Sequence, residues 1–286
     1  MMGLYRFLTH LPWRVRAAVE NRVCSGRFRH ELAVCAIFRE EAPFLDEWLT
    51  FHSGVGVTHF YLYNNYSTDE FRAVLAPWIA RGIVTLHEWP RKVGQLGAYR
   101  HCVRHYRRRA RWIAFIDADE FLFSPQAVDI RPVLRGYDDV PGVLVWGMFF
   151  GANGHERRPA QPLTDAFVRR ASPAVVRSGK TIANPRMIYA IRSPHVFKFT
   201  EGEAVDTSRR PQRLGQHAPV FDLLRYNHYW SRSIEDLKTK VGRGDASTPQ
   251  ARDLAWHLEF EAQLNAEEDR AIVPIAAAIR AGKRGA

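Results

Sequence analysis

The chain has 286 residues, of which 46% are hydrophobic, and this length and composition suit a soluble globular protein with one large α/β domain or two small ones. Its formal net charge of +11 favours a polyanionic partner, namely nucleic acid, anionic lipid or a phosphorylated substrate, without choosing among them. Cys24, Cys35 and Cys102 show no paired spacing and no long apolar run is present, which argues against a disulfide framework, a zinc site, a signal peptide and a membrane-spanning helix.

Residues 1–30 form a basic extension in which aromatic residues such as Phe7 and Trp13 alternate with arginines. The pattern allows a short amphipathic helix that rests on an anionic membrane surface. The simpler interpretation is a helical extension that packs on the domain behind it. Because no linker composition interrupts the rest of the chain, we expect a single domain over 31–250 and a helical segment over 251–286.

From residue 32 onward, apolar runs alternate with segments of helical periodicity. The runs predict buried strands at 32–38, 58–63, 83–86 and 112–116. The intervening segments predict helices that begin near Pro43, after a cap at Ser67 or Thr68, and at Gln95. Such alternation implies an α/β fold with a mostly parallel sheet, in which the polar loops after the strands converge on one crevice.

The second half of the chain is less regular. Apolar runs predict strands at 143–150 and 223–230, and Ser233 can cap a helix that begins at Ile234. Residues 201–219 are rich in Gly, Pro and Arg, which predicts a long loop excursion. The end of the chain, from about Asp253, is predicted to be helical and peripheral.

Asp117 and Asp119 come directly after the buried run at 112–116. Carboxylates just beyond the carboxyl end of such a strand lie where open α/β sheets bind ligands, and two of them can hold a hard divalent cation. The alternative is a strand end capped by solvated acids, because Asp-x-Asp is a common tripeptide. The chain has no Gly-x-Gly-x-x-Gly after its first strand and no P-loop, so phosphate would have to be neutralised by a metal and basic side chains.

Several further blocks occur in a specific order along the chain. They are Glu41-Ala42-Pro43, Tyr61 to Asn65 followed by Ser67-Thr68-Asp69, Gln95 with Tyr99, Trp112 to Phe121, Phe150-Gly151, Lys180-Thr181-Ile182, His195 and Asn227-His228-Tyr229-Trp230. Together they resemble glycosyltransferase family 92 and its bacterial relatives near family 2, from roughly Ala33 to Gly244. The resemblance implies a GT-A fold, a nucleotide-sugar donor, a divalent metal and inversion at the anomeric carbon. Two positions depart from it: Glu40 stands where relatives usually carry Asn, and Asn64 where many carry Asp.

The resemblance also implies residue roles. The metal, Mn²⁺ or Mg²⁺, would be held by Asp117, Asp119 and a late histidine, for which His228 is favoured over His195. Binding of the donor would fall to Glu41, Asn64, Asp69 and Asp117. From the residues themselves, Gln95 and Tyr99 lie one helical turn apart and could face the crevice together, and Lys180 could neutralise phosphate, with Arg243 as a weaker candidate. Asn64 and Asp69 also have a plain structural interpretation, since Asn and Asp commonly cap helices and form turns.

Inverting transfer needs a base that deprotonates the acceptor hydroxyl, and the sequence does not single one out. Glu156, Asp206 and Asp245 all follow the Asp pair in loop-like segments, and His155 is a further candidate. We predict Asp206 for this role.

The sequence therefore predicts a metal-dependent, inverting glycosyltransferase that moves a sugar from a nucleotide-sugar, with a UDP-sugar favoured, to a glycan or glycolipid hydroxyl. It would be cytoplasmic, with peripheral contact on the inner face of an anionic membrane through the basic run at 104–111, unless that run is only a solvated helix end. A non-catalytic nucleotide- or glycan-binding protein is the alternative. No nucleic-acid partner is expected, because zinc, helix-turn-helix and RRM signatures are missing.

Overall fold

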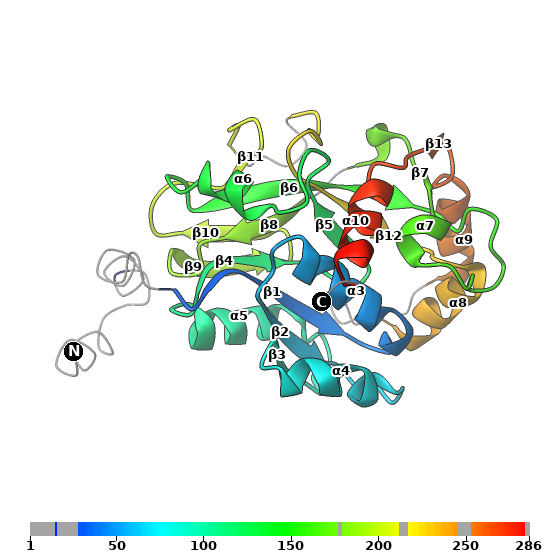
Figure 1. The fold of residues 1–286 in the computed structure, drawn as a ribbon, viewed down its shortest axis with the longest axis horizontal. Coiled ribbons are helices and arrows are strands. Elements are labelled where there is room, and N and C mark those ends of the chain that lie inside the picture. The colour runs from blue at the N-terminus through cyan, green and yellow to red at the C-terminus, as the bar shows by residue number, and fades with distance from the viewer. Residues whose placement is uncertain (1–14, 16–27, 177–178, 212–216, 245–252, 284–286) are drawn as a thin grey trace.

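The computed structural model describes residue 15 and residues 28–176, 179–211, 217–244 and 253–283. The expected helix within residues 1–30 therefore lies almost wholly outside the described residues. The strands are β1 (His30–Phe38), β2 (His59–Asn64), β3 (Val84–Glu88), β4 (Ala110–Phe115), β5 (Glu120–Phe123), β6 (Gly142–Phe150), β7 (Arg169–Arg170), β8 (Gly179–Ala183), β9 (Ile188–Ser193), β10 (Val196–Phe199), β11 (Val205–Asp206), β12 (Arg225–Tyr229) and β13 (Glu267–Glu268). The helices are α3 (Ala42–Gly54), α4 (Phe71–Ala80), α5 (Gln95–Tyr106), α6 (Arg131–Arg135), α7 (Leu163–Ala166), α8 (Ile234–Arg243), α9 (Leu254–Ala262) and α10 (Val273–Lys283), labelled as in Figure 1.

The central sheet confirms the predicted α/β fold. Strands β3, β2, β1 and β4 are neighbours in that order and run parallel, with α3, α4 and α5 as the crossovers. Beyond β4, the antiparallel β8 separates it from β6, and β12 then pairs parallel to β6. The sheet is thus mostly parallel, as the GT-A expectation requires, and its parallel strands end at one edge.

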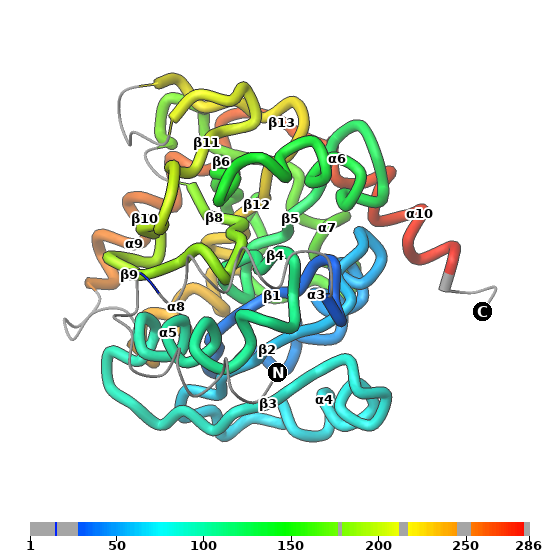
Figure 2. Tube along the Cα trace, turned by 90° about the vertical axis from the view of Figure 1, so that its left-hand side faces the viewer, coloured from blue at the N-terminus to red at the C-terminus, as the bar shows by residue number. Residues whose placement is uncertain are grey.

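The two faces of the sheet are covered by different elements because side chains alternate along each strand. Leu32, Val34 and Ala36 of β1 belong to a core with α3 and α4, whereas Ala33 and Cys35 belong to a second core with α5 and the β9–β10 hairpin. Figure 2 shows α3 and α10 on one side of the sheet and α5 on the other. No helix in the described part of the chain is long and apolar enough to cross a membrane.

Two local expectations are wrong. Neither Ser67 nor Thr68 caps α4; the hydroxyl of Ser67 instead accepts a hydrogen bond from the backbone N–H of Glu40, 2.9 Å away. As expected, the strand before the Asp pair ends ahead of it; a turn follows β4, and β5 then pairs antiparallel to β12. The end of the chain is not peripheral, since β13 pairs with β7 and Ile272 and Ile275 are buried in the core.

Helix α3 fixes the strand that follows the Asp pair. The indole Nε1 of Trp48 donates to the carbonyl of Glu120 at 2.8 Å, and Nε2 of His52 accepts from the backbone N–H of Leu122 at 3.1 Å. The other ring nitrogen of His52 lies 2.8 Å from the carbonyl of Trp48, to which it donates. Burial lowers the pKa of His52 to about 3, so the imidazole stays neutral and keeps its acceptor. Two buried side chains of α3 thereby hold the backbone beside the acids.

We expect acid to destabilise the protein partly through His52. The pKa in the folded state lies below the unfolded value of 6.5, so the stabilisation is complete above pH 6.5 and is lost as pH falls toward 3. The substitution His52→Gln keeps an acceptor but cannot titrate. Between about pH 7.5 and pH 5, its free energy of unfolding in urea should therefore fall by about 2 kcal/mol less than that of the wild type.

The control for this measurement is His217→Gln, which changes a half-buried loop histidine away from α3. It should show the wild-type difference between the two pH values. An equal pH dependence in His52→Gln and the wild type would contradict the assignment of a neutral, accepting His52.

Candidate active site

A cleft of about 320 Å³ opens where the parallel strands end. It is bordered by the ends of β1 and β12, the turn after β4, the start of α5, β8 and the last turn of α8. Its polar lining residues are Arg39, Glu41, Gln95, Asp117, Asp119, Glu120, Lys180, His195, His228, Trp230, Lys240 and Arg243. The structure therefore brings together eight of the residues that the sequence nominated, namely Glu41, Gln95, Asp117, Asp119, Lys180, His195, His228 and Arg243.

Asp117 lies at the inner side of this cleft between a lysine and an amide. Nζ of Lys180 is 2.5 Å from one carboxylate oxygen, and Nε2 of Gln95 donates to the other at 2.7 Å. Lys180 comes from β8, which pairs beside β4, and its side chain is only 3% exposed. Burial would lower the pKa of Lys180, but the carboxylates of Asp117 and Glu120 outweigh it and raise the pKa above its usual value. The buried ammonium of Lys180 thus compensates the negative charge of Asp117.

Asp119 faces a different cation. Nζ of Lys240, on α8, lies 2.6 Å from Oδ2 of Asp119, and Nε2 of His228 lies 3.3 Å from the same oxygen. Burial would raise the pKa of Asp119, but Lys240 and then His228 hold it well below its usual value. Burial lowers the pKa of His228 despite the nearby carboxylate. At neutral pH the cleft therefore presents an ionised Asp119 beside a neutral imidazole.

Glu120 is buried and stabilises the turn that carries Asp117 and Asp119. Its Oε2 accepts the backbone N–H of Asp117 at 2.9 Å and lies 3.5 Å from Nζ of Lys180. Burial raises the pKa of Glu120 well above its usual value; Lys180 opposes this shift, and the carboxylates of Asp117 and Asp119 add to it. The other oxygen of Glu120 is 3.7 Å from Nδ1 of His228. Glu120 thus supports both the Asp turn and the histidine.

Glu41 ties the end of β1 to α8. Arg232 contacts one oxygen of Glu41 at 2.6 Å and Arg243 pairs with the other. Arg243 also donates to the carbonyl of Glu40 at 2.8 Å. Sequence reasoning gave no role to Arg232 or Lys240. Lys240 carries no signal that would distinguish it, because it is one of 41 basic residues and meets Asp119 only through the placement of α8.

Three residues predicted to bind the donor lie behind the cleft and do not line it. Asn64 donates to Glu88 at 2.7 Å and accepts the backbone N–H of Ser67 at 2.9 Å. Asp69 accepts the backbone N–H of Ala42 at 2.7 Å, at the start of α3. Tyr99 is fully buried, with its ring 5.0 Å from that of Phe115. In this structure the three side chains support the loops and α5, and their contact with a donor stays a prediction.

The structure places Asp206, the predicted base, away from the cleft, so this role stays a prediction that the position of the residue does not favour. In β11, Asp206 pairs in register with Leu144 of β6, whereas His228 is opposite Phe149 of that strand, so Asp206 lies roughly 17 Å along the sheet from the cleft. Its carboxylate is 2.7 Å from the guanidinium of Arg210. His155 and Glu156 use their carbonyls to accept the first N–H groups of α8 and do not line the cleft either. Asp245 lies outside the described residues.

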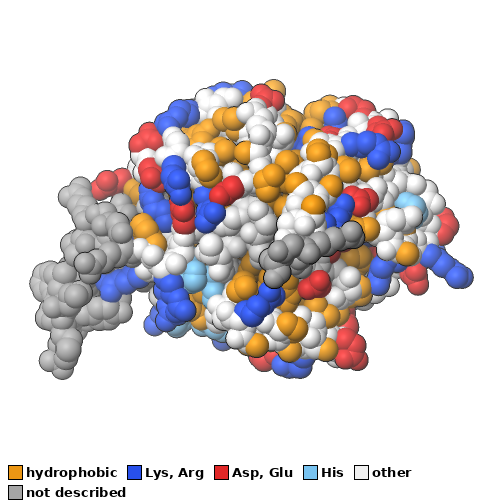
Figure 3. Space-filling view, in the orientation of Figure 1, with side chains coloured by type: hydrophobic (Ala, Val, Ile, Leu, Met, Phe, Trp, Pro, Cys, Tyr) orange, Lys and Arg blue, Asp and Glu red, His pale blue; other side chains and the backbone are white. Residues whose placement is uncertain are grey.

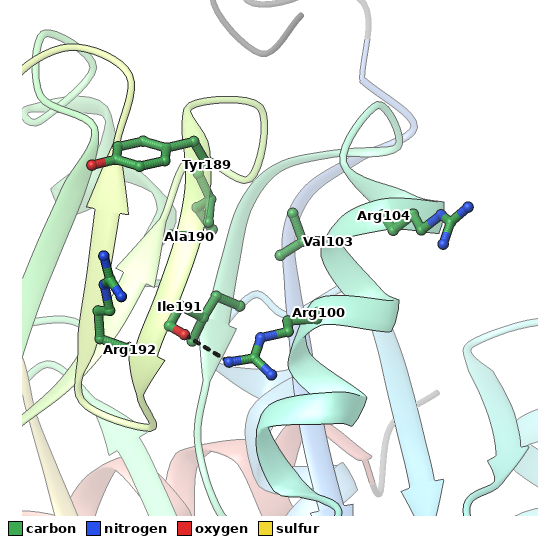
Figure 4. A pocket seen from close by; sticks show the side chains of 8 residues that line it. Arg100, Val103, Arg104, Tyr189, Ala190, Ile191 and Arg192 are labelled. Carbon is green, nitrogen blue, oxygen red and sulfur yellow. Dashed lines mark hydrogen bonds between the residues drawn. The ribbon is translucent and has the colours of Figure 1, made fainter. Parts of the chain in front are cut away.

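A second cavity, of about 510 Å³, lies between α5 and β9 (Figure 4). Arg100 crosses it and donates to the carbonyl of Ile191 at 3.1 Å, while Arg104 and Arg192 border it. It contains no carboxylate, so it lacks the chemistry of the cleft.

The basic run at 104–111 is not uniformly solvated, because Arg107 is buried and donates to the carbonyl of Arg186. On the face drawn in Figure 3, basic and acidic side chains are interspersed rather than gathered into one basic patch.

We expect Lys180 to be essential for stability. Lys180→Met would leave Asp117 and Glu120 without their shared ammonium, and removing one partner of a buried ion pair typically costs about 3–5 kcal/mol. Lys240→Met should cost less, because Lys240 lies at the more open side of the cleft. Urea unfolding measures both, with Lys238→Met on the exposed face of α8 as the control. A Lys180→Met protein as stable as the control would contradict this account of the buried pair.

The chain is similar to several known proteins. A glycosyltransferase family 92 protein of Oryza sativa subsp. japonica is 34% identical over 223 residues, which cover 75% of this chain and 35% of that protein. The galactan beta-1,4-galactosyltransferase GALS2 of Arabidopsis thaliana is 33% identical over 146 residues, covering 46% of this chain and 28% of that protein. The crystal structure of S. aureus TarS 1-349 aligns with a TM-score of 0.42 and 11% identity, covering 82% of this chain and 70% of that chain.

The chain thus spans about a third of the length of the curated relatives that it matches. The model of glycosyltransferase family 92 matches residues 30–237, which include the Asp pair, Lys180 and His228. The predicted family is confirmed: the chain belongs to glycosyltransferase family 92.

Proposed function

We propose that this chain transfers a sugar from a nucleoside diphosphate donor to a hydroxyl group of a glycan or glycolipid. The observation that carries the proposal is the charge arrangement of the cleft: Asp117 and Asp119 stand at the end of β4, and each is paired with a lysine. Arg243 brings a further cation to the lining of the cleft, where it pairs with Glu41. A departing diphosphate needs such fixed positive charge as the bond from sugar to oxygen breaks.

A UDP-sugar is the donor that we favour, and UDP-galactose is the first to test. The support for galactose is the printed activity of the Arabidopsis relative, a galactan beta-1,4-galactosyltransferase. Within the cleft, Gln95 and Glu41 flank the acids from α5 and from the end of β1, so both could contact the nucleoside side of the donor. We also propose inversion at the anomeric carbon, as the family resemblance implies, which the configuration of the product reports.

We further propose Mn²⁺ or Mg²⁺ as the cofactor, held by Asp119 and His228. Among the described residues no group of three or more His, Cys, Asp or Glu is placed to hold a metal ion, so phosphate and water would complete the coordination. The two residues fit this role because Oδ2 and Nε2 lie 3.3 Å apart and because metal ligands must be an ionised carboxylate and a neutral imidazole. A bound divalent cation supplies Lewis-acid stabilisation of the leaving diphosphate.

Lys240 would compete with a metal ion for Asp119. Its ammonium contacts the same oxygen of Asp119 that faces His228, so the ion pair and metal binding are alternatives at this atom. Asp117 is held by Lys180 and Gln95 and would act on the ribose or on waters of the metal. We also retain peripheral contact with an anionic membrane, through exposed residues of the basic run such as Arg104 and Arg109, as part of the proposal.

We expect Asp119→Asn to abolish transfer from UDP-galactose while the protein remains folded. The amide keeps the shape of the side chain but removes the charge that pairs with Lys240 and that would hold a metal. Release of UDP and formation of glycoside, measured with saturating Mn²⁺, check the activity, and the melting temperature checks the fold. Turnover at the wild-type rate would contradict the role of Asp119. Melting shifts with UDP-sugars but no turnover in the wild type would favour the non-catalytic binding protein instead.

His228 should set the metal requirement. Because Nε2 of His228 lies beside the metal-facing oxygen of Asp119, His228→Ala should raise the Mn²⁺ concentration for half-maximal activity by about 10- to 100-fold. His195→Ala is the matched control: this histidine also lines the cleft, but it interacts through Nδ1 with the carbonyl of Gly179 at 3.0 Å. A larger shift in His195→Ala than in His228→Ala would show that the wrong histidine has been assigned.

A further inference from the structure

A row of aromatic rings leads out of the cleft. Trp230 lines the cleft, and its ring centroid lies 5.4 Å from that of His228 and 6.0 Å from that of Phe149. On its outer side, Trp230 meets Phe260 of α9 edge to face at 5.3 Å and Trp256 at 6.5 Å. We call Trp230, Phe260 and Trp256 the aromatic row. It connects the imidazole beside Asp119 to the surface of the molecule without a break.

The outer end of the row is open to solvent. Trp256 is 50% exposed, and its ring stacks on Phe260 with centroids 5.3 Å apart and planes only 8° from parallel. Single exposed apolar side chains are common in soluble proteins and need no explanation. Trp256 differs because its ring continues an aromatic surface that begins inside the cleft. An open indole with a supported back face is a flat, apolar platform.

Helix α9 holds this platform rigidly beside the cleft. A carboxylate oxygen of Glu261 accepts the backbone N–H of Ala152 at 2.7 Å, directly after β6. Oδ1 of Asn265 accepts the backbone N–H of Asn153 at 2.9 Å. Figure 1 shows α8 and α9 together beside the end of β12. Because a ring on an anchored helix loses little freedom when a ligand covers it, the geometry suits a binding surface.

We propose that the aromatic row is a subsite for the acceptor, on which sugar rings of a neutral oligosaccharide chain stack. The inference rests on the proposed function, since it places the hydroxyl-bearing end of the oligosaccharide at the cleft and the following sugars over the open face of Trp256. The ring of Trp230 is already covered by Nζ of Lys240, 4.8 Å from its centroid, and by the stacked ring of His257, so Trp230 links the cleft to Trp256. Sugar rings present a face of C–H groups, and these pack favourably on the electron-rich face of an aromatic ring. The family match ends at residue 237, so it does not assign α9 or Trp256 to any role.

The proposed subsite predicts that binding affinity depends on the length of the acceptor oligosaccharide. The probe is a series of β-1,4-linked galacto-oligosaccharides of increasing length, with binding followed by calorimetry and by the fluorescence of the exposed indole. For the wild type, affinity should rise with length until the chain covers Trp256. Trp256→Ala should weaken binding of the longest oligosaccharide by about 10-fold or more and remove its advantage over the shorter ones, whereas Trp256→Phe should retain part of it.

Leu254→Ala is the matched control, because Leu254 is also exposed on α9 but carries no aromatic ring. It should bind the series as the wild type does, and the melting shift with UDP shows in each variant that the cleft is folded. Binding of the longest oligosaccharide by Trp256→Ala with wild-type affinity would overturn the inference, as would a wild type whose affinity does not rise with length. Length-dependent binding without sugar transfer from any donor would uphold the subsite and remove the proposed function instead.

Discussion

The structure depends on the cost of placing three acids within four residues at the end of a buried strand. Asp119 and Glu120 are buried and Asp117 is partly so, and such carboxylates destabilise a fold unless cations or hydrogen bonds compensate them. The compensation comes from two lysines at separate places in the chain. Lys180 is 63 residues from Asp117, and Lys240 is 121 residues from Asp119. Strand β8 brings Lys180 to Asp117, and helix α8 brings Lys240 to Asp119.

This arrangement also explains why the cleft suits an anionic substrate. Lys180, Lys240 and Arg243 are already paired with carboxylates, so the protein tolerates these cations without a ligand. Arg243 holds Glu41 and two carbonyls at the end of β1, while Lys240 holds Asp119, and both cations project from α8. A diphosphate that enters would compete with the carboxylates for the same groups. Helix α8 is therefore the element whose contacts couple occupancy of the cleft to the fold around it.

The position of the acids is fixed by neutral groups rather than by charge alone. Trp48 and His52 of α3 bind the backbone at Glu120 and Leu122, so the helix on one face of the sheet sets where the turn after β4 ends. The aromatic residues after β12 extend this rigidity outward through Trp230 to α9. The cleft is thus bounded by charged contacts and by packed rings, which meet where Nζ of Lys240 lies over the ring of Trp230.

The sequence by itself determined the order of the elements in the first half of the chain and the location of the Asp pair, because apolar periodicity is local and polar residues after buried strands must gather at the sheet edge. The order of its motifs also predicted the family. Only the tertiary structure decided that Lys240 lines the cleft and that Arg232 pairs with Glu41. It also placed Asn64, Asp69 and Tyr99 behind the cleft and Asp206 far along β6. Buried charges pair with residues that are distant in sequence and come close only when the chain folds. Local sequence patterns therefore do not predict these partners.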